Sequence, residues 1–315
     1  ACAPELKIRE IAPDPDGLFD FFRRVRFVQE GAKTDVEVAE RLASEQQVLC
    51  IVNSRKRARA IYQMLPEEGR FHLSTLMTAV DRERILKMIR ERLKDGQPCR
   101  VVSTSLVEAG VDMDFPTVWR EMAGLDSILQ AAGRCNREGK NDPAESIVHI
   151  FTGEGRVNAG LLLRIAPAVE VLAAYADINT REAIAAYFCK LLGNVGDKSL
   201  DAQNILQLEA KLLFRTVAEK FKVIDDNSLT VYIPTDDNAE DIRLLRLGEY
   251  SRGLLRRLGR TAVNLPQYEF EALVENGVIE SHAQDGFGIL LNPEAYSREC
   301  GLDVNSEGGA ALFIM

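Results

Sequence analysis

Two spacings of hydrophobic and polar residues alternate over the first half of the chain. The apolar run 48–53, bounded by polar residues, is typical of a strand buried on both faces of a parallel sheet. Helical spacing follows at 55–65. The same succession predicts further strands at 70–74, 100–105, 117–121 and 147–151, and helices at 35–45, 81–94 and 126–137. Repeated strand–helix units require a doubly wound, mostly parallel sheet, whose functional loops lie at the carboxyl ends of the strands.

The pattern changes after about residue 155, where we expect a domain boundary. Helical spacing then dominates, at 160–175, 180–192 and 202–220, followed by a short strand at 230–234 and a long helix at 239–259. The whole chain is therefore expected to be α/β, with a helical segment and a smaller α+β domain after the parallel sheet.

Composition narrows the class of protein. The 315 residues are 46% hydrophobic and 28% charged, which is ordinary for a soluble globular protein of about two domains. The net charge of -9 argues against a strongly basic protein that coats DNA. A local groove that contacts phosphates stays open, because the distribution of charge matters more than its sum.

Targeting and redox signals are sparse. No two of the six cysteines form a C-x-x-C pair, which argues against metal knuckles and a disulfide framework and fits a reducing cytoplasm. The first residues lack the pattern of a signal peptide, and charged residues and Pro167 interrupt the most apolar stretch, 161–176. The chain starts at Ala1, which indicates either a cut through a longer protein or a processed terminus.

The segment 124–140 carries the strongest candidate chemistry. Gln130, Arg134 and Arg137 lie at i, i+4 and i+7, which on a helix gives one face. Gly133 would lie beside them inside the helix, where glycine costs about 0.5–1 kcal/mol relative to alanine, and this suggests a close approach to the backbone. Arginines on such a face suit the oxygens of a transferring phosphoryl group.

A purely structural interpretation of this segment is also open. The three side chains would then decorate a solvated helix end. Ser127 and Gln130 fit a capping box, and Asp126 is another candidate cap.

A second segment, 103–115, follows a predicted strand. Its small hydroxyl side chains are common contacts to nucleic-acid phosphates, its glycine permits a tight turn, and its carboxylates are suited to a ribose. These residues are Ser103, Thr104, Ser105, Gly110, Asp112 and Asp114. An ordinary strand-to-loop transition with capping residues is the alternative.

Together these segments resemble motifs V and VI of superfamily 2 helicases. Within that superfamily, SLVEAGVDMDFPTVWRE and AGLDSILQAAGRCNREG resemble the helicase-nuclease of type I CRISPR systems. Residues 47–65 resemble motif IV, 72–86 the conserved block after it, and 291–303 the C-terminal tail of that family. The resemblance implies a RecA-like parallel sheet in the second motor lobe.

The resemblance also implies a division of the chain. The end of a first lobe or a linker would occupy 1–40, the second RecA-like lobe 41–155, a helical linker region 156–222 and a C-terminal accessory domain 223–315.

The resemblance assigns roles to individual residues. Arg137, as arginine finger, and Arg134 would reach ATP bound on the other lobe, while Gln130 would sense the nucleotide. Gly110, Asp112 and Gly133 would lie near the nucleotide. The expected track for single-stranded DNA is lined by Asn53, Ser54, Thr78, Thr104 and Ser105.

Other parts of such an enzyme are missing from the sequence. The nearest match to a phosphate loop, Gly133 to Lys140, has five residues between its glycines where four are required, and Asn141 follows the lysine. No D-E-x-[DH] box and no His-Asp dipeptide occur. We therefore expect no metal site and no nuclease here. ATP and its Mg would be held by an absent first lobe, so this chain alone should not hydrolyse ATP.

Basic clusters add candidate contacts. Arg55, Lys56, Arg57 and Arg59 gather at the start of a predicted helix. The group between Arg252 and Arg260 has few acids nearby and is a candidate DNA or partner contact.

The leading hypothesis is the C-terminal part of an ATP-dependent translocase on single-stranded DNA in CRISPR antiviral defence. Its expected partners are the first lobe and nuclease domain, the type I surveillance complex and an anti-CRISPR inhibitor, with no membrane. The alternatives are a superfamily 2 helicase acting on RNA or duplex DNA, and a non-catalytic module that docks onto the surveillance complex.

Overall fold

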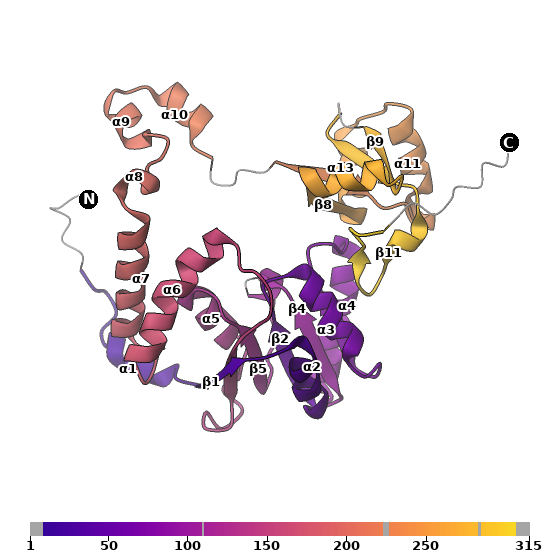
Figure 1. Ribbon diagram of the computed structural model, residues 1–315. Helices are drawn as coiled ribbons and strands as arrows, with labels where there is room; N and C mark the ends of the chain where they lie inside the picture. Colours follow the sequence, from indigo (N-terminus) through magenta and orange to yellow (C-terminus); the bar gives the residue numbers. More distant parts are fainter. Residues whose placement is uncertain (1–8, 109, 223–226, 283–284, 307–315) are drawn as a thin grey trace.

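A six-stranded, all-parallel sheet forms the centre of the computed structural model, which describes residues 9–108, 110–222, 227–282 and 285–306 (Figure 1). The strand order is β1-β6-β5-β2-β4-β3. The strands are β1 (Arg26–Ala32), β2 (Gln47–Ile51), β3 (Arg70–Leu73), β4 (Cys99–Ser103), β5 (Thr117–Glu121) and β6 (Ile147–Thr152). Five of them, β2 to β6, were predicted from the hydrophobic runs to within two residues at each end.

Helices cover both faces of this sheet, because neighbouring residues of a strand point in opposite directions. Leu49 of β2 packs in one buried cluster with Ile85 and Ile89, whereas Cys50 packs in a second with Leu42 and Ile61. The helices are α2 (Asp35–Ser44), α3 (Arg55–Met64), α4 (Ala79–Lys94) and α5 (Leu125–Ala132), with the short 3-10 helix η1 (Ser105–Val107) after β4. The predicted doubly wound α/β fold is confirmed.

The sheet extends further toward the N-terminus than the predicted start of the RecA-like lobe at residue 41. β1 pairs in parallel with β6 at the edge of the sheet, preceded by helix α1 (Pro15–Phe21). Residues 26–32 therefore belong to this sheet, although 1–40 was assigned to a first lobe or linker. As an edge strand, β1 is at most partly buried along its length.

Helices follow β6. Helices α6 (Ala159–Ala174) and α7 (Arg181–Val195) pack on α5 through an apolar cluster that includes Leu125, Val171 and Tyr187. The short helices α8 (Asp197–Leu200), α9 (Ile205–Ala210) and α10 (Phe214–Lys220) continue away from the sheet as an arm (Figure 1). The predicted helix 202–220 is thus broken, with Leu212 in the left-handed region at φ 58°.

A C-terminal unit is built on a second sheet of order β8-β7-β10-β9. Its strands are β7 (Ser228–Tyr232), β8 (Ala262–Pro266), β9 (Ile279–His282) and β10 (Phe287–Leu290), and its helices α11 (Ala239–Arg246), α12 (Arg252–Leu258) and α13 (Gln267–Glu275). The predicted helix 239–259 is divided between α11 and α12 at Gly248, whose φ of +82° ends the first helix.

A small hairpin, β11 (Tyr296–Ser297) with β12 (Gly301–Leu302), fastens the C-terminal unit to the first sheet. The Tyr296 hydroxyl donates to Asp81 Oδ2 at 2.7 Å and accepts from the backbone N–H of Thr78 at 3.0 Å. Leu302 N–H donates to Leu76 O at 2.8 Å. Among the described residues, no helix is long and apolar enough to cross a membrane.

Candidate functional site

The helix of the 124–140 segment is shorter than predicted. α5 ends at Ala132, and Gly133 is its C-cap, with a backbone φ of −64°. Only Gln130 lies on the helix, while Arg134 and Arg137 follow it, so the predicted common helical face is wrong. The chain turns because Phe115 and residues 134–136 exchange backbone hydrogen bonds, which replace those of a continuing helix.

The capping box considered for Ser127 and Gln130 is also absent, since Gly124 is the N-cap of α5. The Ser127 hydroxyl instead donates to Glu108 Oε1 at 2.7 Å. The Gln130 side chain is exposed and lines a hollow of about 460 Å³ together with Ser105 and Asn53. We call this hollow the motif groove.

Arg134 links the two motif segments. Its side chain is buried, and it donates from Nε to Val107 O at 2.9 Å and from Nη2 to Glu108 O at 2.7 Å. Burial lowers the pKa of this guanidinium, and the nearby charge of Arg137 adds to the effect. In this conformation Arg134 fastens the loop after β4 to the segment after α5.

Arg137 is partly exposed and meets Asp112, which was predicted to lie near the nucleotide. Its Nε lies 3.0 Å from Asp112 Oδ1, and 43% of its side chain is exposed. The backbone N–H of Arg137 donates to Asp114 Oδ1 at 2.6 Å. Gly110, at φ +73°, turns the loop that carries Asp112. The structure thus brings three predicted residues, Gly110, Asp112 and Arg137, to one surface.

A buried ionic network at the carboxyl edge of the sheet was missed by sequence reasoning. Arg120, at the end of β5, is 2% exposed. Its Nε lies 3.1 Å from Glu108 Oε1, while Nη1 donates to Asn53 Oδ1 and Nη2 to Ser127 Oγ, both at 2.9 Å. Glu121 accepts from Asn53 N–H at 2.7 Å. The signal for this network in the sequence was the pair of adjacent charged residues, Arg120 and Glu121, at the end of the predicted strand 117–121.

Burial lowers the pKa of the Arg120 guanidinium, and the charges of Glu108 and Glu121 oppose that shift. The network continues to Arg57 on α3, which contacts Glu121 Oε1 at 2.5 Å and donates from Nε to Asp35 Oδ1 at 2.8 Å. These pairs hold the loops after β2, β4 and β5 in a fixed arrangement.

The residues predicted to line a nucleic-acid track divide into two groups. Asn53, Ser54 and Ser105 line hollows of the surface. Thr104 is buried, and Thr78 is 3% exposed with its hydroxyl donating to Asp81 Oδ2 at 3.0 Å. The Tyr296 hydroxyl of the hairpin contacts the Thr78 hydroxyl and covers it. In this conformation Thr78 therefore lines neither the motif groove nor the wider hollow described next.

A wider hollow of about 790 Å³, the α3 groove, lies where α3 and the start of α6 meet α13 and residues 302–305. Five cations line it: Arg55, Lys56, Arg57, Arg59 and Arg156. Ser54 begins α3 with no side-chain cap hydrogen bond.

Three of these cations are neutralised by carboxylates. Arg57 is held within the network described above, Arg55 Nη2 lies 2.5 Å from Glu269 Oε1, and Arg59 Nη1 lies 3.1 Å from Asp303 Oδ2. Lys56 and Arg156 are exposed and form no ion pair with any residue that the structure describes. Free positive charge in the α3 groove therefore comes from these two side chains.

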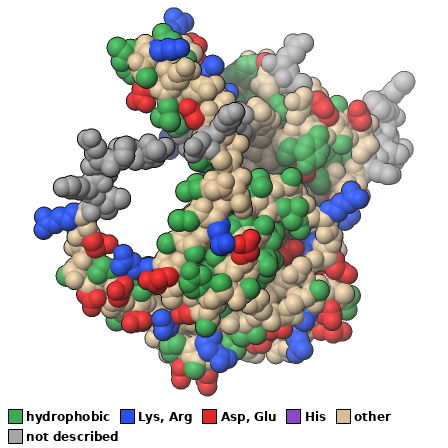
Figure 2. Space-filling model, turned by 60° about the vertical axis from the view of Figure 1, so that its left-hand side comes forward, with side chains coloured by type: hydrophobic (Ala, Val, Ile, Leu, Met, Phe, Trp, Pro, Cys, Tyr) green, Lys and Arg blue, Asp and Glu red, His purple; other side chains and the backbone are tan. Residues whose placement is uncertain are grey.

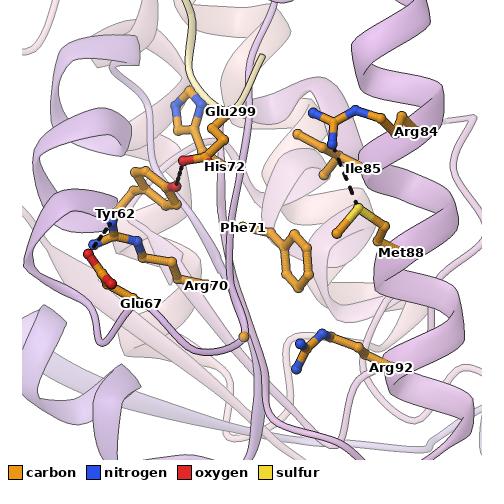
Figure 3. A pocket seen from close by; sticks show the side chains of 11 residues that line it. Tyr62, Glu67, Arg70, Phe71, His72, Arg84, Ile85, Met88, Arg92 and Glu299 are labelled. Carbon is orange, nitrogen blue, oxygen red and sulfur yellow. Dashed lines mark hydrogen bonds and ion pairs between the residues drawn. The ribbon is translucent and has the colours of Figure 1, made fainter. Parts of the chain in front are cut away.

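A third hollow, of about 370 Å³, surrounds the edge strand β3 and shares no lining residue with the other two. Tyr62, Arg70 and His72 lie on one side of the strand, and Phe71 and Met88 on the other (Figure 3). The Tyr62 hydroxyl donates to Glu299 Oε2 at 2.9 Å. Desolvation, first, and the hydrogen bond to Glu299 raise the pKa of Tyr62 to about 12.

Histidine, cysteine and carboxylate side chains do not gather in groups of three or more that could hold a metal ion, within the part of the chain that the structure describes. The five cysteines among these residues, Cys50, Cys99, Cys135, Cys189 and Cys300, are free thiols.

Residues 44–140 match the family described as CRISPR-associated nuclease/helicase Cas3, C-terminal. A Cas3 nuclease/helicase of Methanothermobacter thermautotrophicus is 31% identical over 132 residues, which cover 39% of this chain and 16% of that protein. A Cas3 helicase of Thermoproteus tenax is 29% identical over 131 residues, 41% of this chain and 22% of that protein. The matched part of this chain thus spans less than a quarter of either relative.

Solved structures agree in fold. T. fusca Cas3 with ATP aligns with a TM-score of 0.53 at 15% identity, covering 85% of this chain and 39% of that one. A chain of a CRISPR RNA-guided surveillance complex, pre-nicking, aligns with a TM-score of 0.55 at 14% identity, covering 89% and 44%. Residues 44–140 are thus similar to the C-terminal part of the CRISPR-associated Cas3 nuclease/helicases, and most of the chain shares the fold of solved Cas3 structures.

Proposed function

We propose that this chain supplies the second half of an ATPase site in a single-stranded DNA translocase that unwinds and degrades invader DNA. The observation that carries the proposal is the partly exposed Arg137 guanidinium, oriented by Asp112 at 3.0 Å. Arg137 lies in the connection between α5 and β6, beside the residues that precede β5, and Asp112 lies in the loop between β4 and β5. The match of residues 44–140 to the C-terminal Cas3 family supports this assignment.

Arg137 can serve as the arginine finger because Asp112 contacts its Nε, and no hydrogen bond joins its terminal nitrogens to another described residue. The two terminal nitrogens remain able to donate in parallel to phosphate oxygens, which is the geometry that guanidinium favours. An arginine supplied by a neighbouring lobe stabilises the charge of the phosphoryl-transfer transition state. Gln130, exposed in the motif groove, and the turn at Gly110 would lie toward the same nucleotide.

The nucleotide itself requires residues outside this sequence. The 315 residues contain no G-x-x-x-x-G-K-[ST] loop to cradle phosphates and no D-E-x-[DH] box to hold Mg. We infer that a first lobe presents ATP and Mg to Arg137, so the chain alone does not turn over ATP.

The α3 groove is the proposed contact with single-stranded DNA. Lys56 and Arg156 supply charge that no described carboxylate neutralises, and Asn53 and Ser54 supply polar groups beside them. A positively charged groove that follows the phosphate backbone is the common basis of such binding.

The test is Arg137→Ala in an intact enzyme that includes the first lobe. ATP turnover should fall by about 10³-fold or more, the contribution of an arginine finger, while DNA binding stays measurable. Arg215→Ala is the matched control, since that side chain is 94% exposed on α10. Undiminished turnover in the Arg137→Ala enzyme would refute the half-site.

The second candidate function is docking onto the surveillance complex, and the helical arm α8–α10 favours it. Hydrophobic side chains gather on this arm and on the helices beneath it (Figure 2). Four of them, each more than half exposed, are Leu206, Leu212, Phe214 and Phe221. Exposed apolar patches of this kind mark protein interfaces.

A pull-down with the type I surveillance complex separates the two candidates. If docking is the role of the arm, Leu206→Ser with Phe214→Ser should abolish capture, and Arg134 and Arg137 substitutions should leave it unchanged. Capture that depends on the arginines alone would argue against the docking module.

A further inference from the structure

Helix α13 of the C-terminal unit borders the α3 groove with an exposed aromatic ring. Tyr268, the second residue of the helix, lines the groove and is 69% exposed. The next apolar residues of the helix, Phe270 and Leu273, pack inward in the core of the C-terminal unit. Tyr268 is not part of that core, and its hydroxyl makes one contact that the structure describes, with Glu269 Oε1 at 3.2 Å.

Glu269, on the same helix, forms an ion pair with Arg55, one of the cations that line the groove. One carboxylate oxygen lies 2.5 Å from Arg55 Nη2, and the other, Oε2, is buried with no hydrogen-bond partner among the described residues. A buried acceptor without a partner is costly. The ion pair therefore links Arg55 to the C-terminal unit, but it leaves one oxygen of the Glu269 carboxylate without a hydrogen bond to any described residue.

Asp303 makes a similar contact one helical turn along α3, where Arg59 lies four residues after Arg55. Both arginines face the groove, and both are met by carboxylates from the C-terminal part of the chain. Carboxylate and phosphate compete for the same bidentate face of a guanidinium. Each pair thus occupies a position that a backbone phosphate could take.

We propose that α13 is the second wall of the DNA track, with Tyr268 stacking on an unpaired base and Glu269 holding Arg55 until a phosphate replaces it. The inference rests on the proposed function of the α3 groove and deepens it. A phenol ring offers a sequence-independent surface to any base. The exchange at Arg55 frees the Glu269 carboxylate, whose second oxygen has no described partner.

The experiment measures binding of a fluorescent dT12 oligonucleotide to the 315-residue chain by anisotropy. Tyr268→Ala should weaken binding by about 5- to 150-fold, the range of one base–aromatic stack, and Tyr268→Phe should restore it. Tyr250→Ala is the matched control, because Tyr250 is also exposed and also contacts a carboxylate, Asp285 at 3.1 Å, outside the groove.

The Glu269 contact is tested by salt dependence. Glu269→Gln should tighten binding, because no carboxylate then competes with phosphate for Arg55, and Arg55→Ala should flatten the slope of log affinity against log salt by about 0.7, which corresponds to one lost phosphate contact on a single strand. An unchanged slope would overturn the exchange at Arg55. Thermal unfolding of each variant confirms that the fold is retained.

Photo-cross-linking gives a readout that loss of structure cannot imitate. An oligonucleotide carrying 5-iodouracil should form an adduct on Tyr268, located by mass spectrometry. The inference is overturned if Tyr268→Ala binds with wild-type affinity, or if adducts form only at other residues. In that case the proposed α3 groove still stands, provided that the double variant Lys56→Ala with Arg156→Ala binds more weakly than the wild type. If that double variant also binds like the wild type, the α3 groove is not the contact with DNA, and the inference fails with that proposal.

Discussion

His72 should make the stability of the parallel sheet depend on pH. The side chain lies on the edge strand β3, is 2% exposed, and neither ring nitrogen has a hydrogen-bond partner among the described residues (Figure 3). Desolvation, first, and the positive charge of Arg59 lower its pKa from 6.5 to about 4. The folded state therefore binds the imidazole proton more weakly than the unfolded state does.

The sign and size follow from this difference. Above pH 6.5 the imidazole is neutral in both states and the stability is at its full value. As the pH falls from 6.5 through 4, the unfolded state gains the proton first, and the free energy of unfolding decreases by about 3 kcal/mol in total, at about 1.4 kcal/mol per unit of pKa difference.

The assay is urea unfolding at several pH values between 7.5 and 4.5, followed by the fluorescence of Trp119. This single tryptophan lies buried in β5 of the same sheet. His72→Phe keeps a ring beside Tyr62, whose centroid is 5.7 Å away, but removes the titration. Carboxylates elsewhere titrate alike in both proteins, so the difference between the two curves isolates His72.

We expect the stability of the wild type, relative to His72→Phe, to fall by about 2–3 kcal/mol between pH 7.5 and 4.5. His72→Gln, a second variant without the titration, should show the same pH dependence as His72→Phe whatever its packing cost at neutral pH. Parallel curves for the wild type and both variants would refute the reasoning.

Two further predictions concern stability. Arg120→Met should cost about 3–5 kcal/mol in the same urea assay, because it leaves the Glu108 carboxylate buried without its cation; a loss under about 1 kcal/mol would contradict that view. Gly301→Ala should release the hairpin, since a Cβ there would lie 2.3 Å from Leu76 O and the backbone has φ +78°. Faster hydrogen exchange at the N–H groups of Thr78 and Leu302 would report that release, and unchanged exchange would contradict it.

The parallel sheet was predictable because its strands are continuous apolar runs. A strand buried on both faces, such as 47–51, has little freedom to be anything else. The helices that were predicted too long failed at single backbone positions. Gly133, Gly248 and Leu212 each lie where a helix ends or a turn follows it, and hydrophobic spacing continues across such positions without marking them.

The site was less predictable than the fold. The i, i+4, i+7 spacing of Gln130, Arg134 and Arg137 assumed one helix, and the structure joins the last two to the loop after β4 instead. The contacts of Arg120 with Asn53 and of Glu269 with Arg55 connect residues far apart in the sequence. Such pairs follow from how the strands and the C-terminal unit are arranged, which spacing along one segment does not reveal.

The hairpin has a consequence for the order in which the chain acquires its structure. The six-stranded sheet needs residues only up to Thr152, because β6 fills the place between β1 and β5. The contact of Tyr296 with Thr78 joins positions 218 residues apart. During synthesis the sheet can therefore form early, while the segment before α4 stays uncovered until the residues of the hairpin have left the ribosome. We expect this segment to be the last part of the sheet domain to gain protection from proteases, and the hairpin to be the step that provides it.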